Sequence, residues 1–492
     1  MLASLQSFDA AALRHQEPRE TQVADMLAPT DAADSAAAPT QYVKRGGRWV
    51  LAPLADASAP GAAAPPRSMR GQLHTMHGQC YGFEAERNMY RPPMQTHSAE
   101  HAARPGYDTL SASEYADEPE VLTAKVAQLA RMIVESERFV VYAGAGLSTA
   151  AGIDDYASAA GGRGSTGGGD GAGTKLRSPL CAQPTLSHRV LVGLQRQGRL
   201  YRLVQQNHDG IPQKAGLPQQ FVNEIHGALH APDNPVIPMS GSLRDDNMSD
   251  LLVLEQSADL CLAVGTSLAG MNADRVFTSC AARANNKGNL GAVLVGLQRS
   301  QHDSDCTLRI FGKADEVFQL LAEQIEGLAQ LVPAARPAGE FFRPPFLQAH
   351  SEGEEPAAAG ERYQLERLRY DAMGRHLCAE SDSDSAAALS SLDLRDGAEV
   401  AIPTGMHAGA LGVVDGLDRE GNPKIRFQLK LRLGKAGSFK APMLMPLGTW
   451  WMQAALDGGV AQLPVASFSS SASAGGGGGS AELRAVVEAY AR

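Results

Sequence analysis

The sequence predicts an α/β protein whose main folded part is a Rossmann-like, doubly wound parallel sheet with helices on both faces. Short apolar runs alternate with segments of helical periodicity between residues 118 and 330. Strands that are buried on both faces are apolar throughout, which is typical of parallel sheets. The expected strands are RFVVYAG (138–144), LYRLVQQ (200–206), ADLCLAVG (258–265) and GAVLVGL (291–297).

Helical periodicity marks the segments around these strands. Apolar residues recur at spacings of three and four in EVLTAKVAQLARMIVES, which leads into the first strand and predicts an amphipathic helix. Similar patterns predict helices over 186–197, 271–286 and 313–329. Strands and helices in this alternation predict parallel strands joined by helical crossovers.

The chain is too long for one hydrophobic core, since it has 492 residues. Glycine and proline are abundant, at 51 and 28 residues, and aromatic residues make up only 5%, so we expect disordered segments. We predict five parts: a largely disordered region at 1–105, the α/β domain at 118–330, a linker at 331–390, a small β-barrel of SH3-like or KOW-like type at 391–455, and a flexible tail with a short helix at 456–492.

The small barrel is predicted from short strands that glycine and Asp-Gly turns interrupt, as in GALGVVDGLDREG and KIRFQLKL. Its strands and their connection carry basic residues, at Lys424, Arg426, Lys430, Arg432, Lys435 and Lys440. Two interpretations stay open. The basic residues form a solvated face, or the module binds a nucleic acid or a protein partner.

Charge and cysteine content limit the partners and the compartment. A net charge of −10 and a pI of about 5.7 argue against a nucleic-acid surface over the whole protein. The six cysteines form no CxxC pair, which favours a reducing compartment. No apolar run is long enough to span a bilayer, and the N-terminus lacks the apolar core of a secretory signal. We therefore expect an intracellular protein without membrane association, in the nucleus or the cytoplasm.

A glycine motif follows the first strand directly, as Gly144, Ala145, Gly146, Leu147 and Ser148. Glycine allows a tight turn and a close approach of the backbone to phosphate, and a helix that begins after the turn offers unpaired N–H groups to an anion. The order of strand, glycines and helix therefore predicts a nucleotide site. An ordinary tight turn between strand and helix is the alternative.

Polar residues follow the second strand, where QNHDG supplies Gln206, Asn207 and Asp209. Doubly wound sheets bind ligands at the carboxyl ends of their strands, which favours a ligand site. Asn and Asp are also frequent helix N-caps, so a capping role is equally compatible with these residues.

Two further motifs lie at predicted strand ends. His226 stands in the sequence EIHG, and an imidazole there suits proton transfer because it titrates near neutral pH. Gly265, Thr266 and Ser267 follow the third strand, where the hydroxyls could meet a ribose or a phosphate. A structural histidine and a helix cap are the respective alternatives.

The four motifs occur in one order within one α/β region, and together they resemble those of the sirtuin (Sir2-like NAD-dependent deacylase) family. The segments that carry the resemblance are GAGLSTAAGIDDY, PTLSH, QNHDGIPQKAGLPQQFVNEIHG and ADLCLAVGTSL. The first motif reads STAA and has Tyr156 where other branches have Phe, which is similar to class IV. The resemblance covers about 210 residues.

The resemblance implies NAD as the cofactor, bound in a Rossmann-like crevice. Asn207 and Asp209 would lie around the nicotinamide ribose, and His226 would be the general base. Together these three form the implied catalytic set. The implied cofactor-binding residues are Gly144, Ala145, Gly146, Ser148, Asp155, Tyr156, Gln206, Asn207, Asp209, Gly265, Thr266, Ser267 and Gln298.

The implied reaction is NAD-dependent removal of an acyl group from a lysine of a protein or peptide. Nicotinamide leaves the ribose, the acyl oxygen attacks the ribose carbon, and a base activates a ribose hydroxyl so that the acyl group moves to ADP-ribose. Two other functions stay open. One is NAD hydrolysis or ADP-ribosyl transfer, and the other is a catalytically weak scaffold that binds NAD or ADP-ribose.

Three departures from the family pattern alter these expectations. Family members carry two CxxC pairs between the His-Gly and Gly-Thr-Ser motifs, whereas this chain has only Cys261 there, so we expect no zinc. Ala157 stands where the first motif normally ends in arginine, and a glycine-rich loop follows. The segment PVIPMSGS replaces a strand edge that pairs with the substrate peptide, and Pro238 removes one N–H from it.

Overall fold

The structure is a computed structural model. It describes residues 40–45, 48–53, 76–79, 90–99, 110–153, 182–237, 241–269, 272–284, 286, 288–337, 362–377, 390–432 and 438–467. The chain divides into two units, Met1–Pro65 and Pro66–Arg492. In the first unit, the described residues form one antiparallel hairpin of β1 (Thr40–Arg45) and β2 (Arg48–Pro53). This hairpin lies within the region that the sequence predicts to be largely disordered.

The second unit contains a six-stranded sheet in which every neighbouring pair is parallel. Its spatial order is β10-β9-β8-β5-β6-β7. Numbered from the first strand of this sheet along the chain, the order is 3-2-1-4-5-6, as in dinucleotide-binding folds. The strands are β5 (Phe139–Ala143), β6 (Leu200–Gln205), β7 (Val222–Glu224), β8 (Leu260–Val264), β9 (Gly291–Val295) and β10 (Leu308–Ile310).

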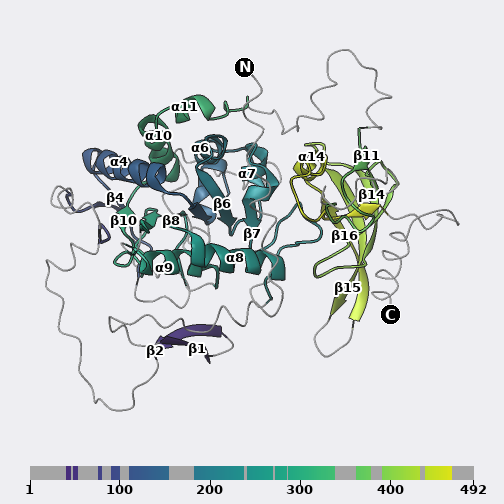
Figure 1. Cartoon of the computed structure of the whole chain (residues 1–492), viewed down its shortest axis with the longest axis horizontal. Helices are drawn as coiled ribbons and strands as arrows, with labels where there is room; N and C mark the ends of the chain where they lie inside the picture. The colour runs from purple at the N-terminus through teal and green to yellow at the C-terminus, as the bar shows by residue number, and fades with distance from the viewer. Residues whose placement is uncertain are drawn as a thin grey trace. The chain divides into compact units, whose positions relative to one another are not determined.

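Helices cover both faces of this sheet (Figure 1). One layer contains α4 (Pro119–Glu135), α6 (Leu186–Arg196), α10 (Ala314–Gln324) and α11 (Leu328–Leu331). The other contains α8 (Asp245–Ser257) and α9 (Arg275–Ala282). The predicted doubly wound α/β fold is therefore confirmed.

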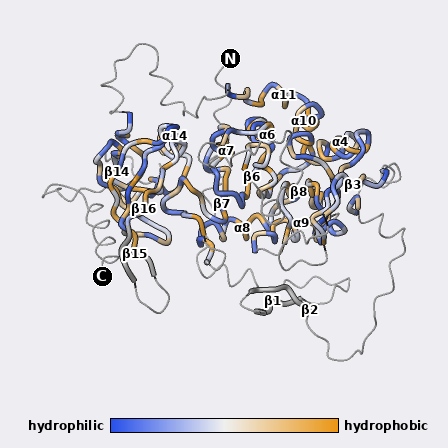
Figure 2. The backbone as a smooth tube through the Cα atoms, turned by 180° about the vertical axis from the view of Figure 1, so that it is seen from behind, coloured by the Kyte–Doolittle hydropathy of each residue, from blue (hydrophilic) through white to orange (hydrophobic). Residues whose placement is uncertain are grey.

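Alternation along the strands explains the two layers. Val141 and Ala143 of β5 pack into the core beneath α4, α6 and α10, whereas Val140 and Tyr142 pack into the core beneath α8 and α9. Successive side chains of a strand point to opposite faces, so a strand that is buried on both faces must be apolar throughout. Figure 2 shows this as hydrophobic colouring along the central strands.

The predicted strands match the observed ones to within a few residues, and the predicted helices are less exact. The helix expected over 271–286 starts with a 3-10 turn (Asn272–Asp274), and α9 then ends at Ala282. The last helix is divided between α10 and α11 because Gly327 adopts a left-handed conformation. β7, α8 and β10 were not predicted. β7 and β10 have only three residues each, too few for a clear periodicity.

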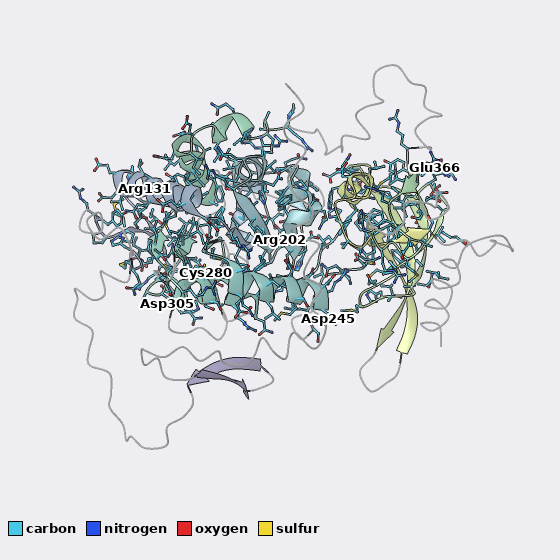
Figure 3. The ribbon with its side chains drawn as sticks, in the orientation of Figure 1. Arg131, Arg202, Asp245, Cys280, Asp305 and Glu366 are labelled. Atoms are coloured by element: carbon cyan, nitrogen blue, oxygen red, sulfur yellow. The ribbon has the colours of Figure 1, made fainter. Side chains whose placement is uncertain are left out.

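Polar pairs join several of these elements. Arg202 on β6 forms an ion pair of 2.8 Å with Asp250 on α8, the helix that begins at Asp245 (Figure 3). A fully buried pair joins Lys125 of α4 to Asp117, whose carboxylate also accepts the Phe311 N–H. Asp117 follows β4 (Glu114–Ala116), which pairs with β3 (Met94–His97). The segment before α4 is thereby attached to the end of β10.

The C-terminal module has its own apolar core. Its five-stranded antiparallel sheet contains β13 (Glu399–Ala401), β14 (Leu411–Leu417), β15 (Pro423–Arg432), β16 (Ser438–Pro446) and β17 (Ala466–Ser467), in the order β16-β15-β14-β13-β17. A second pair, β11 (Gln364–Leu368) and β12 (Ser390–Asp393), and the helix α14 (Thr449–Asp457) complete it. The module therefore contains short antiparallel strands together with the helix α14, and closure into a barrel is not confirmed.

The position of β11 is unexpected, because it lies within the segment predicted to be a linker. Leu365 and Leu368 are buried in the core of the module. Within the described ranges, every helix is too short or too polar to span a lipid bilayer.

Candidate functional site

The middle of the parallel sheet is the point at which the strand order reverses. β5 is the first strand of this sheet along the chain, and it lies between β6 and β8. Crossovers leave such a point in opposite directions, which opens a crevice outside the carboxyl ends of the two central strands. The glycine motif follows β5 and Gly265 follows β8. Two of the four predicted motifs therefore flank this position.

The glycines of the two loops are required by contact between the loops themselves. The Gly146 N–H donates to the Gly265 carbonyl at 2.9 Å. A Cβ atom on Gly144 would lie 2.6 Å from the Gly265 carbonyl oxygen, and one on Gly146 would lie 2.6 Å from the Gly265 Cα. The expected α-helix after the motif is instead a pair of 3-10 turns, Ala145–Leu147 and Thr149–Ala151. The prediction of an α-helix N-terminus at this point was wrong for the described residues.

A hydrogen-bond network joins the glycine loop to the polar loop after β6. The Asn207 side-chain amide donates to the Gly144 carbonyl at 3.0 Å and to the Ser148 hydroxyl at 3.1 Å. The Ser148 hydroxyl in turn donates to Asp209 Oδ2 at 2.8 Å. Asp209 Oδ1 accepts the Ile211 N–H at 3.0 Å. The first and second predicted motifs therefore form one connected structure.

His226 lies in the next loop. It is two residues beyond Glu224, the end of the short strand β7, and it follows the buried Ile225. The loop is attached to the polar loop, because the Leu229 N–H donates to the His208 carbonyl at 3.0 Å. The His208 ring contacts the Gly227 carbonyl through Nδ1 at 2.8 Å. Gly227 has a φ of +83°, and a Cβ atom there would collide with the Pro235 carbonyl. The glycine of the EIHG motif is thus required by backbone conformation.

The imidazole of His226 is neutral at physiological pH. Its pKa is lowered from 6.5 to about 4, mainly by burial and also by the neighbouring His208, while a hydrogen bond with the Gln206 backbone opposes both effects. The side chain is partly buried, so it is reachable from solvent. A neutral imidazole can accept a proton at physiological pH.

Glu224 was not predicted as a site residue, although it precedes His226 by two positions. It is fully buried, and it accepts hydrogen bonds from the side-chain amides of Gln213 and Gln219 at 2.9 and 3.4 Å. Burial raises its pKa to about 7, and Asp209 and Asp233 contribute to the increase. The sequence carried no clear signal for it, because β7 contains only Val222, Asn223 and Glu224 and has no apolar periodicity.

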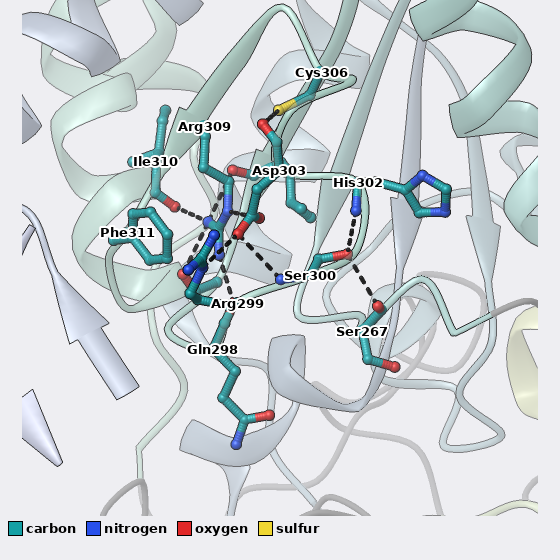
Figure 4. A network of polar contacts seen from close by, with 12 residues as sticks. Ser267, Gln298, Arg299, Ser300, His302, Asp303, Cys306, Arg309, Ile310 and Phe311 are labelled. Atoms are coloured by element: carbon teal, nitrogen blue, oxygen red, sulfur yellow. Dashed lines mark hydrogen bonds and ion pairs between the residues drawn. The ribbon is translucent and has the colours of Figure 1, made fainter. Parts of the chain in front are cut away.

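The loops after β8 and β9 form the rest of the carboxyl edge of the sheet. Gln206 donates to the Thr266 hydroxyl at 2.9 Å, which joins the second and fourth motifs. Ser267 is attached to the loop of Gln298 through Ser300, whose hydroxyl donates to the Ser267 carbonyl at 3.2 Å (Figure 4).

The loop of Gln298 is organised by a buried arginine. The Arg309 guanidinium donates to the carbonyls of Gln298 and Gly296 at 2.6 and 3.0 Å and pairs with Asp303 at 2.6 Å (Figure 4). Its Cζ lies 3.7 Å from the centre of the Phe311 ring. The sequence did not reveal this residue, because an arginine within a three-residue strand has no recognisable motif.

Burial separates the predicted residues into two groups. Ser148 and Asp209 are buried, at 1% and 3% exposure. The partly buried residues along the carboxyl edge are Ala145, Gly146, Gln206, Asn207, His226, Gly265, Thr266, Ser267 and Gln298. The first group can hold the loops in place, and the second group can reach a ligand.

Some predicted residues lie outside the described residues. These are Asp155, Tyr156, Ala157 and the glycine-rich loop that follows, together with Pro238. The side chains of Lys430, Arg432, Lys435 and Lys440 in the C-terminal module also lie outside them. Within the described part of the chain, no group of three or more His, Cys, Asp or Glu side chains could hold a metal ion. The absence of zinc stays a prediction.

Known proteins with similar sequences include NAD-dependent protein deacetylases. The chain is 30% identical over 242 residues to the NAD-dependent protein deacetylase SRT1 of Oryza sativa subsp. indica, which covers 42% of this chain and 49% of the relative. It is 28% identical over 260 residues to the NAD-dependent protein deacetylase sirtuin-7 of Homo sapiens, covering 43% and 62%. The α/β domain of this chain is therefore similar in sequence to members of the sirtuin family.

The similarity to these sirtuins is confined to part of each protein. A bacterial relative, the NAD-dependent protein deacetylase of Cutibacterium acnes, is 29% identical over 190 residues, which cover 29% of this chain and 77% of the relative. The chain spans about half to three fifths of the length of the first sirtuins above. A solved structure described as "Sir2-p53 peptide-NAD+" aligns with 20% identity and a TM-score of 0.33, over 40% of this chain and 97% of its own. No family model matches the chain.

Proposed function

We propose that this chain is a sirtuin and acts as an NAD-dependent protein-lysine deacylase. The proposal rests on the hydrogen-bonded loops at the carboxyl ends of β5 and β6, where the strand order reverses. Asn207, Ser148 and Asp209 are connected there, and His226 lies in the adjacent loop. A pure binding site does not need a neutral imidazole beside these groups. The relatives named as NAD-dependent protein deacetylases support the same activity.

The residues of the edge fit NAD. Half-buried backbone at Ala145 and Gly146 suits phosphates, and Ser267 and Gln298 suit the adenosine end. Asn207 offers a partly buried amide beside the loop of Asp209, which suits the nicotinamide ribose. NAD, when bound, supplies the ribose carbon that the acyl-lysine oxygen attacks as nicotinamide departs.

His226 would move the proton in this reaction. Its neutral ring accepts a proton from a ribose hydroxyl at a ring nitrogen, because its pKa of about 4 leaves the base form populated at neutral pH. Asp209 is almost completely buried, so its contribution is to hold Ser148 and the Ile211 N–H in place. We therefore assign Asp209 a positioning role and His226 the catalytic one.

The decisive experiment follows nicotinamide release from NAD with and without an acetyl-lysine peptide. Release that requires the peptide is expected for a deacylase. His226→Ala is expected to abolish turnover, measured as deacetylated peptide, because the base acts after nicotinamide has left the ribose, while NAD affinity, measured by calorimetry, changes by less than about threefold. His302→Ala serves as the control, because His302 lies on the β9–β10 connection and pairs with Asp305. Unchanged turnover in His226→Ala would remove His226 from the mechanism.

A second function is favoured by one observation about the predicted peptide edge. Residues 227–237, which follow His226, contain no strand. Peptide capture by strand addition needs such an edge. NAD hydrolysis or ADP-ribosyl transfer is therefore the second candidate, and nicotinamide release without peptide would support it. NAD binding without any release would instead support the scaffold function.

The remaining expectations are proposals of the same kind. An acylated protein or peptide is the expected substrate, and the class IV assignment rests on the STAA sequence and Tyr156. An intracellular location in the nucleus or cytoplasm is supported by the free, buried thiols of Cys261 and Cys280. A nucleic acid or protein partner for the C-terminal module stays open. Among its basic residues, Arg426 forms an ion pair with Asp415.

A further inference from the structure

The C-terminal module contacts the loop that follows Asp209. Gly210 has a left-handed φ of +65°, and a Cβ atom there would lie 2.9 Å from Cη2 of Trp450 on α14. The Trp450 ring therefore packs directly on the Gly210 backbone. Gly210 is also the residue from which the short helix α7 (Ile211–Lys214) begins. A residue of the module thus contacts the start of this helix.

The same tryptophan contacts the loop that follows His226. The rings of His230 and Trp450 have centroids 4.9 Å apart in an edge-to-face arrangement. The Gly448 N–H, two residues before Trp450, donates to the His230 carbonyl at 3.0 Å. His230 is fully buried, and burial lowers its pKa to about 3, so its ring is neutral. Trp450 therefore lies against both loops that carry the proposed catalytic residues.

A buried ion pair joins the end of the same short helix to the module. Lys214 Nζ lies 2.8 Å from Glu420 Oε2, and the two side chains are only 1% and 2% exposed. Two opposite charges in such surroundings depend on each other, because removal of one leaves the other desolvated and unpaired. The module therefore holds α7 at both ends, through Trp450 at Gly210 and Glu420 at Lys214.

External support at this helix has a physical reason. A helix of four residues is far too short to be stable by itself. Its first N–H, at Ile211, donates to Asp209, and Asp209 accepts the Ser148 hydroxyl. Movement of α7 would therefore move the Asp209 carboxylate and the residues bonded to it.

We propose that Trp450 is a positioning residue for the Asp209 loop. The C-terminal module thereby supports the geometry of the proposed NAD site. The inference deepens the proposed function and rests on it wherever catalysis is the readout. It assigns the module a role that needs neither a nucleic acid nor a protein partner.

Two adjacent tryptophans allow a controlled test in the full-length chain. Trp450 is not among the apolar side chains that form the module's own core, whereas Trp451 packs against that core. Trp450→Ala thus removes the contacts of this ring with Gly210 and His230. Trp451→Ala is the matched control for damage to the module. Trp450→Phe retains a ring against Gly210 and is the rescue variant.

The first readout is hydrogen exchange of the amides of residues 211–217, which requires no activity. The Ala215 and Leu217 amides donate to carbonyls within this segment, and the Lys214 amide donates to the Gly210 carbonyl. Their exchange is expected to accelerate at least about tenfold in Trp450→Ala and to stay near the native rate in Trp450→Phe and Trp451→Ala. Equal exchange in Trp450→Ala and the native chain, or equal acceleration in both alanine variants, would overturn the proposal.

The second readout is steady-state nicotinamide release. Trp450→Ala is expected to lower kcat/KM for NAD by roughly 10–100-fold while the KM for the acetyl peptide changes little. Loss of affinity for both substrates would indicate general unfolding and contradict a positioning role. If the native chain releases no nicotinamide, the proposed function fails, and the exchange measurement still decides the positioning role of Trp450.

Discussion

The Ser148 hydroxyl donates a hydrogen bond of 2.8 Å to the Asp209 carboxylate and thereby connects the loop after β5 to the loop after β6. Asn207 adds a second connection, since its amide donates to the Ser148 hydroxyl. Ser148 is 61 residues from Asp209 in the sequence, and it is nearly inaccessible to solvent. The hydroxyl that the motif suggested as a ligand contact therefore also has a structural function.

The first prediction concerns this hydrogen bond. Ser148→Ala should lower the free energy of unfolding by about 1–3 kcal/mol, because the bond involves a charged acceptor in a buried position. NAD affinity measured by calorimetry should fall with it. Thr149→Ala is the matched control, since the adjacent Thr149 hydroxyl donates only to the Gly146 carbonyl at 3.2 Å. Equal losses in the two variants would contradict a specific role for Ser148.

The second prediction concerns the pH dependence of His226. Its pKa in the folded chain is about 4, below the ordinary 6.5, so the acid limb of turnover, measured as deacetylated peptide, should lie well below pH 6.5. His208→Leu should move this limb upward, because His208 contributes to the lowering. Between pH 6.5 and 4 the unfolded chain binds a proton that the folded chain does not, so this group should reduce stability as the pH falls. An acid limb near 6.5 in the native chain would refute the assignment.

The third prediction concerns Glu224, whose shift has the opposite sign. Its pKa is raised to about 7, so the folded chain holds a proton that the unfolded chain has released between pH 4.5 and 7. Its contribution to stability should therefore be lost as the pH rises through this range, by up to roughly 3 kcal/mol. Glu224→Gln should remove this dependence in urea unfolding at pH 5 and pH 8. The exposed Glu323→Gln should leave the dependence unchanged.

The fourth prediction separates steric contact from backbone conformation at Gly265. Gly265 and Gly288 both have positive φ, at +62° and +84°. A Cβ atom at Gly265 would collide with the Leu147 amide nitrogen, whereas one at Gly288 meets nothing within 4 Å. Gly288→Ala should therefore lower stability by about 1–2 kcal/mol and Gly265→Ala by roughly 2–4 kcal/mol, measured by urea unfolding. Equal effects would show that the contact between the two loops is unimportant.

The fifth prediction concerns the buried Arg309. Arg309→Met should lower stability by about 3–5 kcal/mol, because it leaves the Asp303 carboxylate buried without its main partner. Arg299→Met is the control, since Arg299 reaches the same carboxylate at 3.5 Å but is 38% exposed. A weaker NAD affinity in Arg309→Met alone would support the role of Arg309 in ordering the loop of Gln298. Similar effects of both variants on stability would contradict the dominant role of the buried pair.

Much of the α/β domain could be predicted from the sequence. The strands β5, β8 and β9 are continuous apolar runs, and β6 is apolar except for Arg202 and Gln205. The polar or glycine residues that follow these strands had to lie at one edge once the strands were parallel. The motif set carried the family resemblance for the same reason. The strands β7 and β10 escaped prediction because three residues carry too little periodicity.

The tertiary structure alone decided which residues support the site. Glu224, Arg309 and Trp450 belong to no local pattern. Glu224 and Arg309 act through partners in neighbouring elements, and Trp450 acts through Gly210, which is far away in the sequence. Local sequence determines strand, turn and helix because backbone sterics and side-chain alternation operate over a few residues. Burial, pKa and loop support depend on which distant segments pack together, and that information exists only in the folded chain.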